Sequence, residues 1–489
     1  MLNISLSKFK SLYFRKKNQL IYYSTKTNGE KEIGNLINNF LNEKNSFIFE
    51  SVEKGFIKGR YTIFGRNPDK IWEFNNNNCK LIYKNRSIKL KGSPKHNIEK
   101  IIENFKFDIP KKLPPISSIL SGYFSYDIIR YIEKIPNSTK NDLNIPDARI
   151  LRPRNLIIHD NFDKKLYFII NIFNDEKIKN FQNKLTQVNR QIEEMVFLAN
   201  YKSTKTIINS KKLSKIKSNI SKKRFISNVK KAKKYIKIGD IFQVVLSQRF
   251  EAQLSKKPLE IYKKLRVTNP SPFMFFFNFS DFQIIGASPE ILVRLRDNKI
   301  TIRPIAGTRP RGRNSREDKF YEKDLLNDKK ELSEHLMLLD LGRNDAGKVS
   351  KINTVKVTEN FIIEKYSHVM HIVSNVVGKY NRKFSKFKSL LAGFPAGTVS
   401  GAPKIRAMEI IDELETTKRK VYAGGIGYFS ANGEFDTCIA LRTAVAKKNK
   451  FYVQAGAGIV ADSKPLKEYE ETVNKAKALI NALKWKKLY

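Results

Sequence analysis

The spacing of hydrophobic positions changes near residue 200. Before it, short runs of β character, such as residues 46–51, 61–65 and 165–173, alternate with a few helical patches. After it, helical and strand patterns come in longer runs that are grouped rather than strictly alternating. This grouping predicts an α+β fold with antiparallel sheets flanked by helices and a smaller N-terminal lobe.

A Lys-, Ser-, Thr- and Asn-rich segment separates the two patterns and is typical of a surface linker. We therefore predict an N-terminal domain over residues 1–200, a linker over 201–221 and a second domain over 222–489. Within the second domain, the pattern predicts one long helix over residues 317–341.

Residues 454–475, QAGAGIVADSKPLKEYEETVNK, combine a glycine pattern with a charged segment near the C-terminus. They predict a strand, a turn at Gly456 and Gly458, and a helix opened by Ser463 with Pro465 in its first turn. Five apolar residues at helical spacing predict its buried face: Leu466, Tyr469, Val473, Ala476 and Ile480.

Glu468 and Glu471 fall on the other face of this helix, and Glu331 and Glu334 form a similar i,i+3 pair on the earlier helix. Alone, each pattern is more typical of a solvated face, with an i,i+4 ion pair from Glu471 to Lys475 worth a few tenths of a kcal/mol. Two such helices facing each other would suit one hard divalent cation, first of all Mg²⁺. The sequence does not place them face to face.

Composition indicates a folded protein, because 41% of the 489 residues are hydrophobic and 11% are aromatic. The formal charge of +46, from 93 Lys and Arg against 47 Asp and Glu, raises a basic nucleic-acid-binding protein as a hypothesis. The lysines are scattered among Asn and Ile, however, with no aromatic-interleaved basic stripe. We expect no nucleic-acid partner, and a basic surface that favours small anionic substrates.

Cys79 and Cys438 are far apart and lack metal-ligand spacing, which indicates a reducing compartment without a disulfide framework. Lysines interrupt the apolar residues of the first 14 positions too early for a signal peptide, and no window approaches the roughly 18 apolar residues of a membrane span. We expect a cytoplasmic protein that does not bind membranes.

Three glycine-rich segments, residues 394–404, 422–438 and 455–458, lack both P-loop spacing and a G-x-G-x-x-G pattern after a strand. A nucleotide is therefore not indicated, and such turns can be purely structural. Together with Arg442 and Lys404 they suit a ligand that carries carboxylates.

Residues 222–480 resemble the family of chorismate-utilising enzymes and, within it, the large synthase subunits of anthranilate synthases. Residues 47–65 resemble the N-terminal domain of the same family. The resemblance rests on eight ordered blocks: 239–250, 286–295, 303–312, 333–350 (SEHLMLLDLGRNDAGKVS), 368–378, 394–411 (FPAGTVSGAPKIRAMEII), 435–443 and 455–463.

The resemblance implies a Mg²⁺-dependent site for chorismate. Glu334 and Glu471 are expected as metal ligands, with Glu331 and Glu468 supporting them through water. The ion and the backbone of Gly456, Ala457 and Gly458 are expected to hold the ring carboxylate. The remaining pocket residues are Arg442 and Tyr428 for the enolpyruvyl carboxylate, with Thr398 and Lys475 lining the pocket.

The resemblance also implies two catalytic residues. Glu290 is expected as the general acid that helps the ring hydroxyl to leave, and His371 as the residue that assists the later proton removal. A lone His is also often a buried structural residue with one hydrogen bond, and that alternative stays open.

Two positions separate related activities. Isochorismate and salicylate synthases carry a lysine that activates water where this chain has Gln243, and aminodeoxychorismate synthases typically carry a lysine where this chain has Ala306. The resemblance thus implies ammonia as the nucleophile and anthranilate and pyruvate as products, the first committed step of tryptophan biosynthesis. The alternatives are an aminodeoxychorismate synthase component I and a catalytically inactive relative.

Neither cysteine has the context of a glutaminase nucleophile, so we expect a separate glutamine amidotransferase subunit, in a heterotetramer of two synthase and two amidotransferase subunits. The family binds tryptophan as an inhibitor, and Ile48-Phe49 replaces two leucines of that motif. We expect feedback inhibition to be retained, with these inhibitor-binding residues: Glu50, Ser51, Asn269, Pro270 and Met274.

Overall fold

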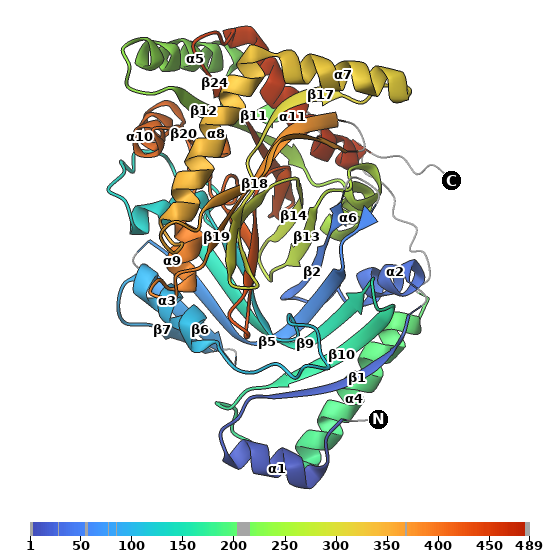
Figure 1. Cartoon of the computed structure of the whole chain (residues 1–489). Coiled ribbons are helices and arrows are strands. Elements are labelled where there is room, and N and C mark those ends of the chain that lie inside the picture. The colour runs from blue at the N-terminus through green and yellow to red at the C-terminus, as the bar shows by residue number, and fades with distance from the viewer. Residues whose placement is uncertain are drawn as a thin grey trace.

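The computed structural model describes residues 3–27, 29–53, 57–76, 78–84, 86–202, 216–366 and 369–484. Helices cover the outside of a large, strongly curved set of strands (Figure 1). The predicted α+β class with antiparallel strands is confirmed. No helix in these ranges has the length and apolar character needed to cross a bilayer.

The helices are α1 (Leu6–Phe14), α2 (Glu30–Asn39), α3 (Pro94–Asn104), α4 (Phe181–Asn200), α5 (Lys222–Lys237), α6 (Pro258–Thr268), α7 (Ser315–Asn327), α8 (Lys329–Gly347), α9 (Lys386–Ala392), α10 (Lys404–Leu414) and α11 (Pro465–Lys484), with 3₁₀ turns η1 (Tyr126–Tyr131) and η2 (Gly397–Val399). The strands are β1 (Gln19–Lys26), β2 (Ser46–Glu50), β3 (Val52–Glu53), β4 (Ile57–Lys58), β5 (Tyr61–Asn75), β6 (Asn78–Tyr83), β7 (Arg86–Lys89), β8 (Ile119–Phe124), β9 (Ala148–Asp160), β10 (Lys165–Ile172), β11 (Lys217–Ser218), β12 (Gln243–Gln253), β13 (Phe273–Asn278), β14 (Gln283–Ser288), β15 (Ile291–Arg296), β16 (Lys299–Ile302), β17 (Ile305–Pro310), β18 (Lys356–Lys365), β19 (Val369–Lys379), β20 (Gly401–Ala402), β21 (Gly425–Ser430), β22 (Phe435–Ile439), β23 (Thr443–Lys447) and β24 (Lys450–Ile459).

The two predicted domains share their sheet. Strand β2 pairs with β13, with Glu50 opposite Met274, and β8 pairs with β21, with Ser121 opposite Tyr428. Most strands thus belong to one hydrogen-bonded network that crosses the predicted boundary. The boundary itself falls between α4 and β11, and residues 203–215 of the predicted linker lie outside the described residues. The N-terminal strands therefore support the second half directly, rather than forming a lobe with a separate sheet.

The predicted turn at Gly456 and Gly458 is wrong, because both residues lie inside β24. This strand runs antiparallel to β12, with Ser247 opposite Gly456 and Val245 opposite Gly458. A Cβ atom on Gly456 would lie 2.6 Å from the hydroxyl oxygen of Tyr422. Glycine is needed here for close approach of neighbouring side chains rather than for a turn.

The single long helix predicted over residues 317–341 is also wrong, because it is two helices. Asp328 has an extended backbone between α7 and α8, and its side chain accepts hydrogen bonds from the backbone N–H groups of Lys330 and Glu331. An aspartate in this position caps the new helix and favours the break.

Helix α11 begins at Pro465 as predicted, and its predicted buried face is confirmed except at Leu466. Leu466 is 46% exposed, whereas Thr472 is fully buried and its hydroxyl accepts a hydrogen bond from Gln248 of β12. Because this contact fixes the helix against the sheet, Glu468 becomes buried while Leu466 faces outward.

Asp412 of α10 connects the two halves of the chain. It is buried and accepts hydrogen bonds from Arg130, from the backbone N–H and hydroxyl of Ser138, and from the hydroxyl of Thr139.

We predict that Asp412→Ala lowers the free energy of unfolding by about 2–4 kcal/mol, because donors of Arg130, Ser138 and Thr139 lose their buried acceptor. Urea denaturation followed by circular dichroism measures this. The control is Asp340→Ala, which removes an exposed i,i+3 pair with Arg343 and should change the unfolding free energy by less than about 0.5 kcal/mol. Equal effects of the two substitutions would contradict the assignment.

Candidate active site

Glu290 lies in the break between β14 and β15. It is 5% exposed, and its Oε1 accepts a hydrogen bond of 3.0 Å from the hydroxyl of Thr398. Burial raises the pKa of Glu290 to about 8, against the smaller opposing effect of the Thr398 hydrogen bond. At neutral pH this carboxyl group is mostly protonated, which is the state that a general acid needs.

His371 of β19 is held as a neutral imidazole. Its Nδ1 lies 2.8 Å from the carbonyl oxygen of Gly307, which can only accept, so Nδ1 carries the proton and Nε2 keeps its lone pair. Burial lowers the pKa of His371 to about 4, and the positive charges of Arg442 and Lys475 act in the same direction. The ring is therefore neutral at neutral pH, the state in which Nε2 can accept a proton during a reaction step.

Arg442 precedes β23 with a φ of 46°, a left-handed conformation that is uncommon for a residue with a side chain. Burial lowers the pKa of its guanidinium. Within the described residues no carboxylate pairs with it. A partly desolvated guanidinium without a protein partner is suited to a ligand carboxylate.

Two tyrosines near the sheet differ in their surroundings. The predicted substrate residue Tyr428 packs its ring against Phe49, with ring centroids 5.8 Å apart, and lies beside the predicted tryptophan segment. Tyr422, which sequence reasoning missed, directs its hydroxyl toward Gly456. Burial raises the pKa of Tyr422 to about 12, so it stays a hydrogen-bond donor. The structure thus places the hydroxyl of Tyr422 beside Gly456 and packs the ring of Tyr428 against Phe49.

Both acidic helices reach the glycines of β24. Glu334 of α8 has its Oε1 3.7 Å from where a Cβ of Gly458 would lie, and the amide of Gln243 lies on the same side at 3.0 Å. On α11, Lys475 donates to the Gly456 carbonyl at 3.2 Å and forms a 2.6 Å ion pair with Glu471. The negative charge of Glu471 raises the pKa of Glu334, so the carboxylates of the two helices lie on the same side of the site.

The carboxylates repel one another. Burial raises the pKa of Glu334, and the negative charges of Glu331 and Glu471 raise it further. The pKa values of Glu331 and Glu468 are raised by burial and by Glu471 as well. No three Asp, Glu, His or Cys side chains in the described ranges are close enough to hold a metal ion together. Mg²⁺ needs only one or two carboxylates, because it keeps several waters, so an all-oxygen set crowded in this way fits it.

The predicted inhibitor residues gather around the β2–β13 pair. Glu50 accepts hydrogen bonds from Tyr262 and from Arg266, the latter at 2.9 Å, so its charge is already balanced. Met274 is fully buried opposite it. Asn269, at the end of α6, has a buried Nδ2 for which the described part of the chain offers no hydrogen-bond acceptor. Pro270 follows it and is partly buried.

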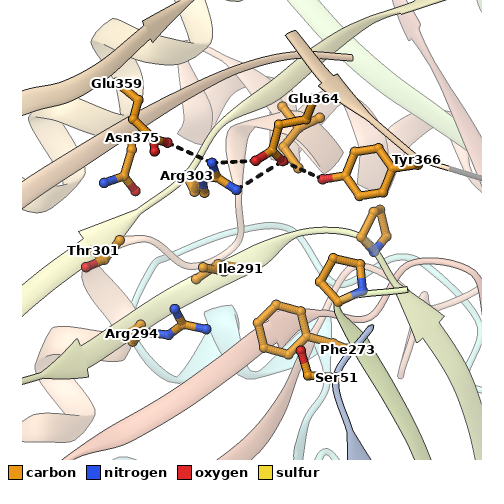
Figure 2. Close-up of a pocket in the computed structure, with 13 residues that line it drawn as sticks. Ser51, Phe273, Ile291, Arg294, Thr301, Arg303, Glu359, Glu364, Tyr366 and Asn375 are labelled. Atoms are coloured by element: carbon orange, nitrogen blue, oxygen red, sulfur yellow. Dashed lines mark hydrogen bonds and ion pairs between the residues drawn. The ribbon is translucent and has the colours of Figure 1, made fainter. Parts of the chain in front are cut away.

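A cavity of about 350 Å³ lies next to Ser51, and sequence reasoning did not find it. Figure 2 shows Arg303 between Glu359 and Glu364, and Glu364 also accepts from Tyr366 at 2.8 Å. The wall of the cavity consists of Ser51, Pro272, Phe273, Pro289, Ile291, Arg294, Thr301, Arg303, Ile305, Glu359, Glu364, Tyr366 and Asn375.

Residues in the wall of this cavity adjoin both predicted catalytic residues. Pro289 and Ile291 are the two chain neighbours of Glu290, and the ring of Tyr366 packs edge-on against His371 at 5.6 Å. Glu364 and Tyr366 lie outside every motif block, so nothing in the sequence pattern marked them.

A comparison with known proteins identifies the family of this chain. A model of the chorismate binding enzyme family matches residues 44–481. The chain belongs to the family of chorismate-binding enzymes. Within it, anthranilate synthase component 1 from Cereibacter sphaeroides is 46% identical over 95% of this chain and 94% of the relative.

Two solved structures agree with this family in fold. Anthranilate synthase component I from Streptococcus pneumoniae is 37% identical with a TM-score of 0.77, covering 86% of this chain and 92% of that one. The menaquinone-specific isochorismate synthase from Escherichia coli, 17% identical with a TM-score of 0.71 over 98% and 99% of the two chains, shares the fold. The resemblance to the anthranilate synthase large subunits is confirmed.

The raised pKa of Glu290 predicts how stability changes with pH. Between the ordinary value of 4.5 and about 8, the folded chain keeps a proton that the unfolded chain has lost, so the unfolding free energy falls as pH rises, by up to about 1.4 kcal/mol per pH unit. We predict that Glu290→Gln removes this part of the dependence. Urea denaturation of both proteins at several pH values tests it, and parallel curves for the two would contradict the raised pKa.

Proposed function

We propose that this chorismate-binding enzyme is the synthase component of an anthranilate synthase, which converts chorismate and ammonia to anthranilate and pyruvate in the first committed step of tryptophan biosynthesis. The observation that carries the proposal is the buried, protonated Glu290 in a chain whose relatives are anthranilate synthase components. Hydroxide is a poor leaving group, so its departure from the ring needs such an acid.

The residues divide the work between binding and proton transfer. Arg442 and Tyr422 bind the enolpyruvyl carboxylate, and the backbone of β24 from Gly456 to Gly458 holds the ring carboxylate. Glu290 gives its proton to the leaving hydroxyl. The Nε2 atom of His371 later takes the ring proton whose loss makes the ring aromatic.

Mg²⁺ is the proposed cofactor. Glu334 and Glu471 would hold it, with Glu331 and Glu468 acting through water, and when bound it draws electron density from the ring carboxylate. Lys475 now neutralises Glu471 and is the group that such an ion would displace.

Gln243 favours ammonia over water as the nucleophile. Its Oε1 is buried without a hydrogen-bond partner among the described residues, so it can accept an N–H from ammonia, but an amide cannot deprotonate water. Ala306, opposite Ile372 of β19, has no amine to attack covalently. These two residues favour anthranilate over isochorismate and over the aminodeoxychorismate alternative.

Ammonia comes from a partner glutamine amidotransferase, in a proposed assembly of two synthase and two amidotransferase subunits. Both cysteines of this chain are buried, and burial raises the pKa of each thiol. A glutaminase needs a reactive thiolate instead, so neither cysteine suits the task.

Tryptophan is the proposed feedback inhibitor, and the 350 Å³ cavity is its proposed site. Of the residues expected to bind tryptophan, Ser51 lines this cavity, and its hydroxyl is a donor for the inhibitor's carboxylate. A ligand in this cavity would contact Pro289, Ile291 and Tyr366. Because these residues adjoin Glu290 and His371, its binding can shift both catalytic residues.

The test is to incubate the purified chain with chorismate, Mg²⁺ and an ammonium salt and to identify the product by fluorescence and chromatography. Anthranilate is expected, and isochorismate or aminodeoxychorismate as the product would refute the proposal.

We predict that Glu471→Gln lowers kcat/KM at least about a hundredfold, because removal of one anionic ligand weakens a hard-metal site. The matched control is Glu470→Gln on the exposed side of the same helix, which should act as wild type. Equal activity of the two variants would show that the ion binds elsewhere.

We predict that Ser51→Phe, which fills one side of the large cavity, raises the tryptophan concentration for half-inhibition at least about tenfold while activity without tryptophan is kept. Ser7→Phe on the exposed face of α1 is the control. Unchanged inhibition in the Ser51 variant would place the inhibitor elsewhere.

A further inference from the structure

A second, smaller cavity lies beside Glu290. It has a volume of about 30 Å³ and is lined by Glu290 and Thr398 at one part of its wall and by Gly342 and Asp345 of α8 at another. None of the residues proposed to bind the carboxylates of chorismate lines it. The rest of the wall is mostly apolar: Ile291, Leu292, Ile302, Arg303, Pro304, Leu338, Leu341, Gly393, Ala396 and Gly397.

Its size and polar groups suit water and little else. A cavity of about 10–15 Å³ already admits one water molecule, provided that it offers two to four polar partners. Glu290, Thr398, Asp345 and Arg303 supply such groups around this cavity. A carboxylate-bearing substrate is far too large for it.

Asp345 gives the cavity a polar end that the proposed chemistry does not otherwise use. Its side chain is 5% exposed and pairs with Lys404 at 2.8 Å and with Lys348 at 2.9 Å. Lys404 is itself largely buried, whereas Lys348 is 58% exposed. The Asp345 carboxylate thus connects the cavity wall to a side chain in solvent.

We propose that this cavity receives the water molecule formed at Glu290 and that Asp345 binds that water on its way to solvent. The inference rests on the proposed function. In the step concerned, the lone pair of ammonia forms a bond to the ring carbon beside the ring carboxylate and the ring double bonds shift. The bond between the hydroxyl oxygen and its ring carbon breaks with the electrons on oxygen, and the oxygen takes the proton of Glu290. One water, the Glu290 carboxylate and the protonated amino intermediate result.

Removal of this water matters for the product. Water that stays beside the activated ring competes with ammonia for addition or restores the starting alcohol. A pocket that takes the water away from the ring lowers both back-reactions, and it does so without a contact to either carboxylate of the substrate. Its loss should therefore lower kcat and leave the KM for chorismate unchanged.

Gly342→Ala closes the cavity with little disturbance. A Cβ at Gly342 would lie 3.5 Å from Cγ2 of Ile302 and 3.7 Å from Cδ of Pro304, which are ordinary contact distances. Alanine is also a better helix former than glycine, so the variant should be at least as stable as wild type. The matched control is Gly347→Ala on the same helix, where a Cβ would meet nothing within 4 Å.

The experiment measures anthranilate formation with chorismate, Mg²⁺ and ammonium for wild type, Gly342→Ala and Gly347→Ala, together with their melting temperatures. We expect kcat of Gly342→Ala to fall about tenfold with unchanged KM and an unchanged or raised melting temperature, and Gly347→Ala to match wild type. Asp345→Asn, which keeps the shape but removes the charge, should lower kcat less.

Wild-type kcat in Gly342→Ala would overturn the proposal. A high-resolution crystal structure of the wild type should also show ordered water between Glu290 and Asp345, displaced in Gly342→Ala, and a dry wild-type cavity would overturn the proposal as well. Failure of the wild type to form anthranilate would instead refute the proposed function, so the two failures are distinguishable.

Discussion

The antiparallel pairing of β24 with β12 is the constraint that places the glycine backbone of the site and the acidic helix that follows it. Because Gly456 and Gly458 lack side chains, β24 lets Tyr422, Gln243 and Glu334 approach its backbone closely. Helix α11 follows β24 and packs back on the same two strands through Thr472 and Gln248, which brings Glu471 and Lys475 over the glycines. Because side chains alternate along a strand, a shift of β24 by one residue would turn Gly456 and Gly458 to its other face.

Several charged side chains of the site are buried without a full set of oppositely charged partners, and this sets their pKa values. Arg442 has no carboxylate partner among the described residues, while Glu334 lies among other acids that raise its pKa. Both arrangements cost free energy in the empty protein, and both are relieved by a ligand that brings anionic groups together with a cation. Glu290 differs, because burial alone keeps it protonated and therefore reactive.

Sequence reasoning went furthest where a function depends on residue type within a motif. It predicted the fold class, and the resemblance named Glu290, Thr398 and Lys475, of which the first two share a hydrogen bond and the third reaches Gly456 of β24. It missed the strand character of Gly456, since a Gly-Ala-Gly pattern resembles a turn until its partner strand is known. It did not mark Tyr422, because only the folded chain brings that hydroxyl beside Gly456.

The two cavities could not be predicted from the sequence at all. Their walls combine residues from segments far apart in the chain, such as Ser51 with Tyr366 and Gly342 with Thr398, and apolar neighbours such as Ile291 line both. Only tertiary packing creates such volumes. Both cavities adjoin the segment between β14 and β15 that holds Glu290. The proposed inhibition and the proposed release of water therefore both act at this segment.

The proposed function depends most on whether α8 and α11 hold one divalent ion beside chorismate with Glu290 at the ring hydroxyl. A crystal structure with Mn²⁺ and chorismate measures this directly, because the anomalous signal of Mn²⁺ locates the ion. The account predicts one anomalous peak between Glu334 and Glu471, a carboxylate of chorismate at Arg442, and the ring hydroxyl within hydrogen-bond distance of Glu290. An ion away from these two glutamates, or chorismate bound in the cavity beside Ser51, would contradict it.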